Sequence, residues 1–177
     1  MNDELIRLTL AAGAKKATII RTEDIMLSSV FRDICASNSC GKYGRCWMCP
    51  PDIGEIGELM ARLKEYRHGL LYQTIYAIED SFDIEGMGEA AVSHARVSQA
   101  VNDAVKPYLP GCLHLSCGGC NLCERCAKLD DQPCRLPDKA LPPMEGYGID
   151  VYQTVKPTDL RYTNGQNTVT FFGIVLY

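Results

Sequence analysis

Four cysteines recur at every third position in the stretch Cys117-Gly-Gly-Cys120-Asn-Leu-Cys123-Glu-Arg-Cys126, and Cys134 follows eight residues later. Packed cores repeat with periods of 2 or about 3.6 residues, so core packing does not explain a step of three. In a glycine-flanked turn, this step can bring successive thiolates round to face one point. Bacterial ferredoxins bind iron–sulfur clusters through a similar Cys-x2-Cys-x2-Cys run. The stretch therefore predicts an iron–sulfur site.

A four-iron cluster needs four protein ligands, and this region offers five cysteines. One quartet is Cys120, Cys123, Cys126 and Cys134. The other is Cys117, Cys120, Cys123 and Cys134, which would leave Cys126 free to reach another cluster. A zinc site built from two Cys-x2-Cys pairs is the alternative, and it would leave Cys134 idle. The spacing by itself leaves both quartets open.

A second group of cysteines lies earlier in the chain, with the spacing Cys35-x4-Cys40-x5-Cys46-x2-Cys49, followed by Pro50 and Pro51. Four thiols match a complete cluster, although this spacing would also suit zinc. Gly, Asn, Ser and Pro dominate residues 31–53, so we expect an irregular loop here. The sequence predicts a metal site at this loop too.

The composition and the charge restrict the cellular location and the binding partners to be expected. The chain has 177 residues, ten cysteines and a net charge of −4, and it has no Lys/Arg run that could follow a nucleic acid. No segment approaches the roughly 20 apolar residues that span a bilayer, and the first residues are acidic where a signal peptide would be basic. We therefore expect a cytoplasmic protein that binds neither nucleic acid nor membrane. Thiols stay reduced in that compartment, so metal ligation is the expected use of the cysteines.

The remaining candidate motifs are weaker. The segment Gly86-Met-Gly-Glu-Ala-Ala91 fits a dinucleotide-binding pattern, but no strand directly precedes it, and the acid expected at a strand end, Asp103, falls inside the same predicted helix. His94 lies on the apolar face of that helix, as a core histidine would. His114 is a further candidate ligand because it lies near the cysteines, and His68 is expected at a helix–strand junction.

Two charged residues follow the second cysteine region. Glu145 is expected to open a helix and to stabilise its positive N-terminal end. Arg135 could pair with a cluster sulfide or with a surface carboxylate. A catalytic acid is the less favoured alternative for Glu145.

The chain between the cysteines predicts an α/β domain, with α+β as the alternative. Helices are expected at residues 3–14, 55–65, 85–106 and from about 145; strands are expected at 17–22, 68–78, 111–115 and 167–176. Asn164-Gly165 predicts a hairpin between residues 160–163 and the last strand. The strand at 68–78 is apolar on both faces, as a central strand covered on both sides would be. We predict one domain over residues 1–177, a mixed sheet covered by helices, with cysteine loops at about 35–51 and 117–137.

Three segments together resemble one known family. They are Cys35…Cys40-Gly-x-Tyr-Gly-x-x-Trp-x-Cys49-Pro-Pro, Gly119-Cys-x-x-Cys-x-x-Cys126…Pro133-Cys-Arg-x-Pro137, and Met144-Glu-x-Tyr-Gly-Ile-Asp-Val151. The chain from about residue 15 to its C-terminus is similar to a family of predicted metal-binding proteins of bacteria and archaea, common in anaerobes, whose function is unknown.

The resemblance implies two ligand sets. Cys35, Cys40 and Cys49 match the first set of the family; Cys120, Cys123, Cys126 and Cys134 match the second, which selects one of the two quartets. Cys46, Cys112 and Cys117 are additions in this chain. Whether Cys46 completes the first site is therefore the open question.

The sequence thus predicts an iron–sulfur protein with two [4Fe-4S] clusters, which transfers electrons to a partner protein or assists an enzyme of anaerobic metabolism. With Cys46 as a ligand, the first cluster would be closed and suited to electron transfer. With only Cys35, Cys40 and Cys49, one iron would be open to substrate, and the protein could be an enzyme. The third alternative is a zinc-stabilised interaction module.

Overall fold

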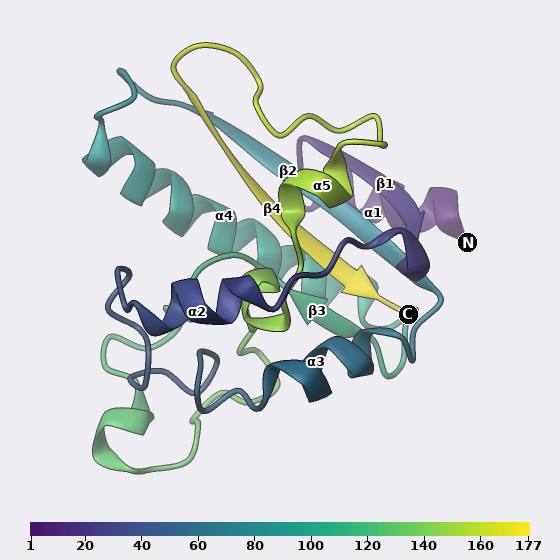
Figure 1. Cartoon of the computed structure of the whole chain (residues 1–177). Helices are drawn as coiled ribbons and strands as arrows, with labels where there is room; N and C mark the ends of the chain where they lie inside the picture. Colours follow the sequence, from purple (N-terminus) through teal and green to yellow (C-terminus); the bar gives the residue numbers. More distant parts are fainter.

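A four-stranded sheet forms the centre of the molecule in the computed structural model, which describes residues 1–177 (Figure 1). The strand order is β1-β2-β4-β3, and all strand pairs are antiparallel. The strands are β1 (Lys16–Arg21), β2 (His68–Ala77), β3 (Leu113–Leu115) and β4 (Thr168–Leu176). The predicted α/β class, a sheet covered by helices, is confirmed, although the strands of the expected mixed sheet all pair antiparallel.

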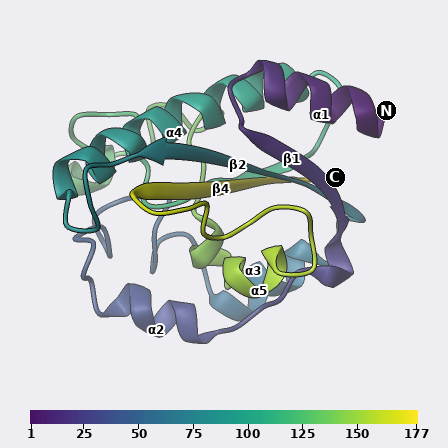
Figure 2. The same ribbon diagram turned by 90° about the horizontal axis from the view of Figure 1, so that it is seen from above.

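Helices cover both faces of this sheet (Figure 2). One face carries α1 (Asn2–Ala11) and α4 (Ile84–Val105). The other carries α2 (Val30–Ala36), α3 (Ile56–Leu63), the 3-10 turn η3 (Met144–Tyr147) and α5 (Val151–Val155). No helix combines the length and the apolar character needed to cross a membrane.

The pleat of the central strands divides the core into two. Leu70 and Tyr72 of β2 pack with α1 and α4, whereas Leu71, between them, packs with α3, η3 and α5. Successive side chains of a strand point to opposite faces, so a strand between two helical layers must be apolar on both. This confirms the prediction of a doubly covered central strand.

A network of polar side chains is buried between α4 and the sheet. The Tyr72 hydroxyl lies 2.9 Å from Ser98 Oγ and 2.8 Å from His114 Nε2, and Ser98 Oγ lies 3.0 Å from Ser116 Oγ. The Tyr72 ring crosses β4 at Gly173, its direct partner in the strand register. Buried polar groups need such partners, and the network fixes the chain immediately before Cys117.

The three histidines all have defined structural places. His94 belongs to the same network, with Nδ1 2.8 Å from Thr74 Oγ1, so its assignment as a core histidine is confirmed. His114 is also enclosed in the network, and it is not placed among the thiols. Burial lowers the pKa of His94 to about 4 and that of His114 to about 3, which keeps both rings neutral. His68 begins β2 and packs on Tyr177, with 5.6 Å between the ring centroids.

Two predictions about local structure are wrong. Residues 160–163 form no strand, so there is no hairpin at Asn164-Gly165. Instead, Tyr162 stacks on Phe172 with 5.8 Å between ring centroids, and Asn164 donates to the Arg161 carbonyl. The first cysteine loop, expected to be irregular throughout, contains helix α2.

The expected helix from Glu145 is divided into η3 and α5, because Gly148 adopts a positive φ of 76° between them. Asp150, and not Glu145, caps the helix by accepting a hydrogen bond from Gln153 N–H. The predicted capping role of Glu145 is therefore wrong, since η3 has no side-chain cap.

Candidate metal centre

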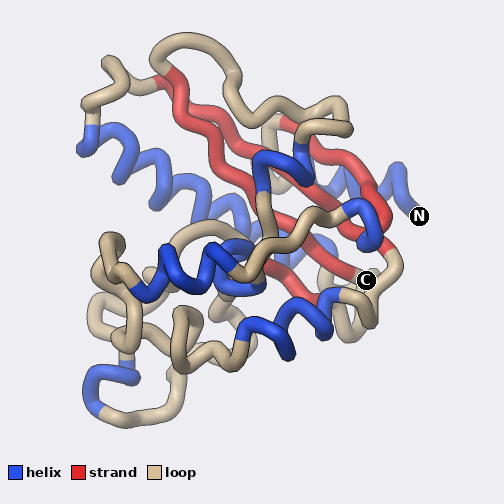
Figure 3. Tube along the Cα trace, viewed as in Figure 1, coloured by secondary structure: helices blue, strands red, loops and turns tan.

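The two cysteine loops lie against each other, although they are far apart in the sequence. Trp47 Nε1 of the first loop donates to the Gln132 carbonyl of the second at 2.8 Å, and Lys42 Nζ donates to Asn121 Oδ1 at 2.9 Å. Much of the chain in both loops has neither helix nor strand (Figure 3). These side-chain contacts therefore hold the loops together where no backbone ladder does.

Lys128 is the centre of a second set of contacts between the loops. Its Nζ lies 2.6 Å from Asp52 Oδ1 and 4.5 Å from the centroid of the Trp47 ring. The Lys128 and Asp52 side chains are only 21% and 14% exposed, so this ion pair is less screened by water than a surface pair. The cation over the ring adds a cation–π contact.

Three cysteines of the first loop share one cavity. Cys35 on α2, Cys40 and Cys49 line a space of about 240 Å³. The Glu145 side chain of η3 lines the same space, and Gly118 and Gly119 of the second loop form another wall. The first cavity, as we call it, thus receives residues from three separate segments of the chain.

The second cavity lies between the two loops and is lined by five cysteines. They are Cys46, Cys120, Cys123, Cys126 and Cys134. Its volume is about 20 Å³, which is room for roughly one water-sized group. Cys46 therefore faces the second cavity, although the other three cysteines of the first loop line the first.

The two cavities adjoin at Cys46 and Cys49. Both residues are buried, with 2% and 5% exposure, and their thiols interact. This interaction is the largest cause that lowers the pKa of Cys46 to about 6 and raises that of Cys49; backbone N–H groups of Met48 and Cys120 also favour the Cys46 thiolate. One member of the pair is thus poised to become a thiolate.

Gly119 allows the second loop to approach Cys49 closely. A Cβ at this position would lie 3.2 Å from Cys49 Sγ and 2.9 Å from Lys42 Cγ. Glycine has no Cβ, so the backbone can form the wall between the thiols of the two loops.

The carboxylate of Glu145 lies beside thiols. Burial raises its pKa, and its Oε2 atom is buried without a hydrogen-bond partner. Burial also raises the pKa of Cys35, and the charge of Glu145 raises it further; in the same way burial and Glu145 raise the pKa of Cys117 to about 12. Glu145 is therefore close enough to both thiols to affect their ionisation.

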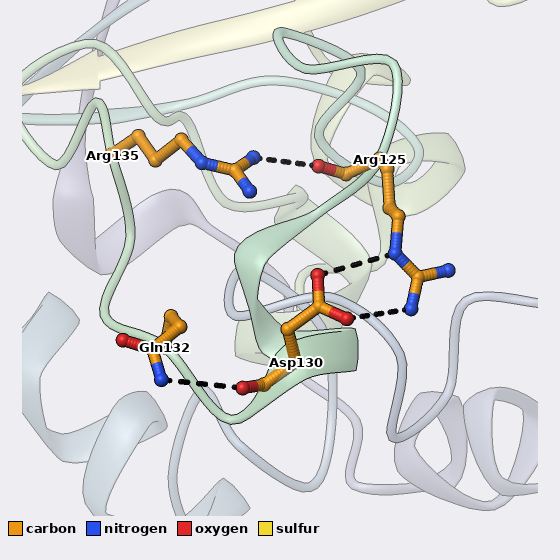
Figure 4. Close-up of polar contacts among 4 residues, drawn as sticks. All are labelled: Arg125, Asp130, Gln132 and Arg135. Carbon is orange, nitrogen blue, oxygen red and sulfur yellow. Dashed lines mark hydrogen bonds and ion pairs between the residues drawn. The ribbon is translucent and has the colours of Figure 1, made fainter.

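Arginines close the outer part of the second loop (Figure 4). Arg135 Nη1 donates to the Arg125 carbonyl at 2.8 Å, and Arg125 Nη2 donates to Asp130 Oδ1 at 2.8 Å. Arg135 thus binds a backbone oxygen and not a surface carboxylate, and it lines the second cavity. Gln132 Nε2 contacts the Asp130 carbonyl at 3.4 Å across the same turn.

All ten cysteines are free thiols. Eight of them line the two cavities, while Cys112 packs beside the core of α1 and α4, and Cys117 lines neither thiol cavity. No three Cys, His, Asp or Glu side chains converge closely enough to hold one metal ion in common. The thiols surround the two cavities, and they would have to move closer together to bind a single ion.

Sequence reasoning did not place Glu145 with the first cysteines. It belongs to the segment Met144–Val151, which also carries part of the family resemblance, and that segment follows Cys134 after only nine intervening residues. The closeness of Glu145 to Cys134 in the sequence was a signal that it belongs to the site. Its carboxylate, however, lies with the cysteines of the first loop and not with those of the second.

A helix-covered antiparallel sheet that carries two adjoining cysteine-lined cavities defines the molecule as a cysteine-rich metal-binding domain by its donor chemistry. The model of the family described as predicted metal-binding protein (DUF2284) matches residues 18–177. The chain belongs to this family. No curated protein and no solved structure matches the chain.

Proposed function

We propose that this protein is a cytoplasmic iron–sulfur protein that transfers electrons to a partner protein. The observation that carries the proposal is the meeting of the two loops, which gathers eight thiols around two adjoining cavities. Thiolates are soft ligands that favour iron–sulfur clusters and zinc over hard cations. Two redox centres that share a wall would give an electron a short path through the molecule.

The first cavity supports a [4Fe-4S] cluster best. Its volume of about 240 Å³ leaves room for a group larger than one ion, and Cys35, Cys40 and Cys49 would be the thiolate ligands. A cluster bound there would supply one-electron redox chemistry. Because only three thiols line this cavity, the alternative of an enzyme with one accessible iron also applies to this site.

Cys120, Cys123, Cys126 and Cys134 would hold the second cluster. Cys46 faces the same cavity, where it accepts a hydrogen bond from Cys120 N–H, and hydrogen bonds to sulfur tune the reduction potential of a cluster. The cavity of about 20 Å³ is smaller than a cluster, so the loop must open to receive one.

That small volume favours one alternative, a structural zinc ion in the second loop. Zinc takes four thiolates at about 2.3 Å in a closed tetrahedral site. The zinc ion would then only stabilise the second loop, and redox chemistry would take place in the first cavity alone.

Metal analysis of protein purified without oxygen separates these possibilities. Two clusters predict about eight iron and eight sulfide per chain, with absorption near 400 nm that bleaches on reduction. About four iron and one zinc would assign zinc to the second loop, and zinc without sulfide would end the redox proposal. Cys35→Ser and Cys126→Ser should each remove about half of the iron, whereas Cys112→Ser, outside both cavities, should remove none.

A further inference from the structure

Three thiols line the first cavity. Cys35 and Cys40 come from one end of the first loop and Cys49 from the other, while Cys46 faces the second cavity. A four-iron cluster bound by three cysteines has one iron that can take a further ligand, from the protein or from solution. The question is which other group that lines this cavity could be the fourth ligand.

Glu145 bears the only carboxylate in this wall, and the other polar side chains there are the hydroxyls of Ser39 and Tyr43. The other wall residues are Phe31, Ile34, Ser39, Tyr43, Pro50, Gly118, Gly119 and Pro143. The position of the carboxylate is set by η3, which packs against α2, the helix that carries Cys35. The thiol and the carboxylate are therefore held on two elements in mutual contact.

One oxygen of the carboxylate is unpartnered, although the backbone N–H of Glu145 itself hydrogen bonds to the group. Its Oε2 atom is buried without a hydrogen bond. A buried oxygen of this kind is costly unless it is paired or binds a metal. Arg32, which contacts the adjacent Gly146, forms no ion pair with the carboxylate; Arg32 Nη1 and Nη2 donate to the carbonyls of Gly54 and Gly146 at 2.8 and 3.3 Å.

We propose that the Glu145 carboxylate is the fourth protein ligand of the metal group in the first cavity. This assignment rests on the proposed iron–sulfur function, and it gives the site three thiolates and one carboxylate. A carboxylate is a harder ligand than a thiolate and suits hard cations better, so one iron differs from the other three. The site then has one position at which a small oxygen ligand can replace the protein ligand.

Glu145→Ala tests the assignment, with Glu145→Cys as the restoring variant and Glu124→Ala as the control. Glu124 is an exposed carboxylate on the second loop. Glu145→Ala should lose about one iron per chain and give, when oxidised, the EPR signal of a three-iron cluster. Glu145→Cys should keep all of its iron with changed g values, and Glu124→Ala should match the wild type. Unchanged iron and EPR in Glu145→Ala would overturn the assignment.

A second measurement needs no variant. Wild-type protein grown with glutamate labelled with ¹³C at the side-chain carboxyl should show ¹³C hyperfine coupling in pulsed EPR of the reduced cluster, and its absence would refute ligation. The two proposals fail differently. Wild-type protein without iron and sulfide would refute the cluster itself, whereas a loaded cluster without ¹³C coupling would refute only the role of Glu145.

Discussion

Replacing Gly173 by alanine should strongly destabilise the molecule, because the space above this residue is filled by Tyr72. A Cβ built on Gly173 would lie 2.7 Å from Tyr72 Cε1 and closer still to Cζ and Oη. Tyr72 is fully buried and cannot turn away without losing its hydrogen bonds to Ser98 and His114.

The expected loss of stability is the sum of two contributions, the overpacking of the core and the loss of two hydrogen bonds. Overpacking a core costs about 1–3 kcal/mol, and two hydrogen bonds contribute roughly 1 kcal/mol each. The free energy of unfolding should fall by roughly 3–5 kcal/mol. At about 2–4 °C per kcal/mol for a chain of this length, the melting temperature should fall by roughly 6–20 °C.

Thermal unfolding of the metal-loaded protein, followed by circular dichroism without oxygen at one scan rate, measures this shift. The matched control is Gly88→Ala, on the exposed face of α4, where a Cβ would have no neighbour within 4 Å. Alanine should stabilise that helix by about 0.5–1 kcal/mol. If Gly173→Ala melts within about 2 °C of the wild type, the close contact with Tyr72 is not a constraint, and the reasoning is refuted.

Three further predictions concern the thiols and the buried histidines. Gly119→Ala should push on Cys49 Sγ, 3.2 Å from the new Cβ, and should lower the iron content by up to about half, while the signal of the second cluster stays unchanged. Cys117→Ser should keep wild-type iron and sulfide, because this thiol lines neither thiol cavity; a lost cluster would contradict that placement. The depressed pKa values of His94 and His114 mean that the unfolded chain binds more protons below about pH 6.5, so stability should fall with falling pH. The slope should reach about 1.4 kcal/mol per pH unit for each ring, and a urea midpoint that stays constant between about pH 6.5 and 5 would contradict it.

The elements with strong periodicity could be predicted from the sequence. The apolar run from His68 becomes β2, and the long amphipathic segment from about 85 becomes α4, each within one residue of its expected bounds. Both elements are long, and their hydrophobic pattern agrees with their final burial. Local sequence and tertiary environment favour the same structure here.

The hairpin failed because contacts elsewhere in the chain outweighed a local turn signal. Tyr162 gains a ring stacked on Phe172, and the Asn164 side chain bonds to the Thr170 hydroxyl as well as to the backbone. These contacts hold residues 160–163 over the face of the sheet. Asn-Gly indicates a turn, but it cannot show whether both flanking segments will pair.

The candidate site was only half visible in the sequence. Cysteine spacing assigns each thiol to a loop, but it does not show which cavity the thiol faces. Cys46 and Cys49 lie three residues apart, yet they face different cavities. The contact between Trp47 and Gln132 joins residues 85 positions apart and leaves no periodic trace. Glu145 likewise reaches its thiol neighbours through packing, which spacing cannot encode.

The position of β4 in the chain has a consequence for biosynthesis. β4 lies between β2 and β3 in the sheet, and it follows both cysteine loops in the sequence. Until the ribosome has made this strand, β3 has no partner, and the second loop has no anchored base. Domains fold as units during synthesis. The thiols of both loops therefore leave the ribosome before β4 completes the sheet, and a metal group bound in the assembled cavities would be inserted only after β4 is made.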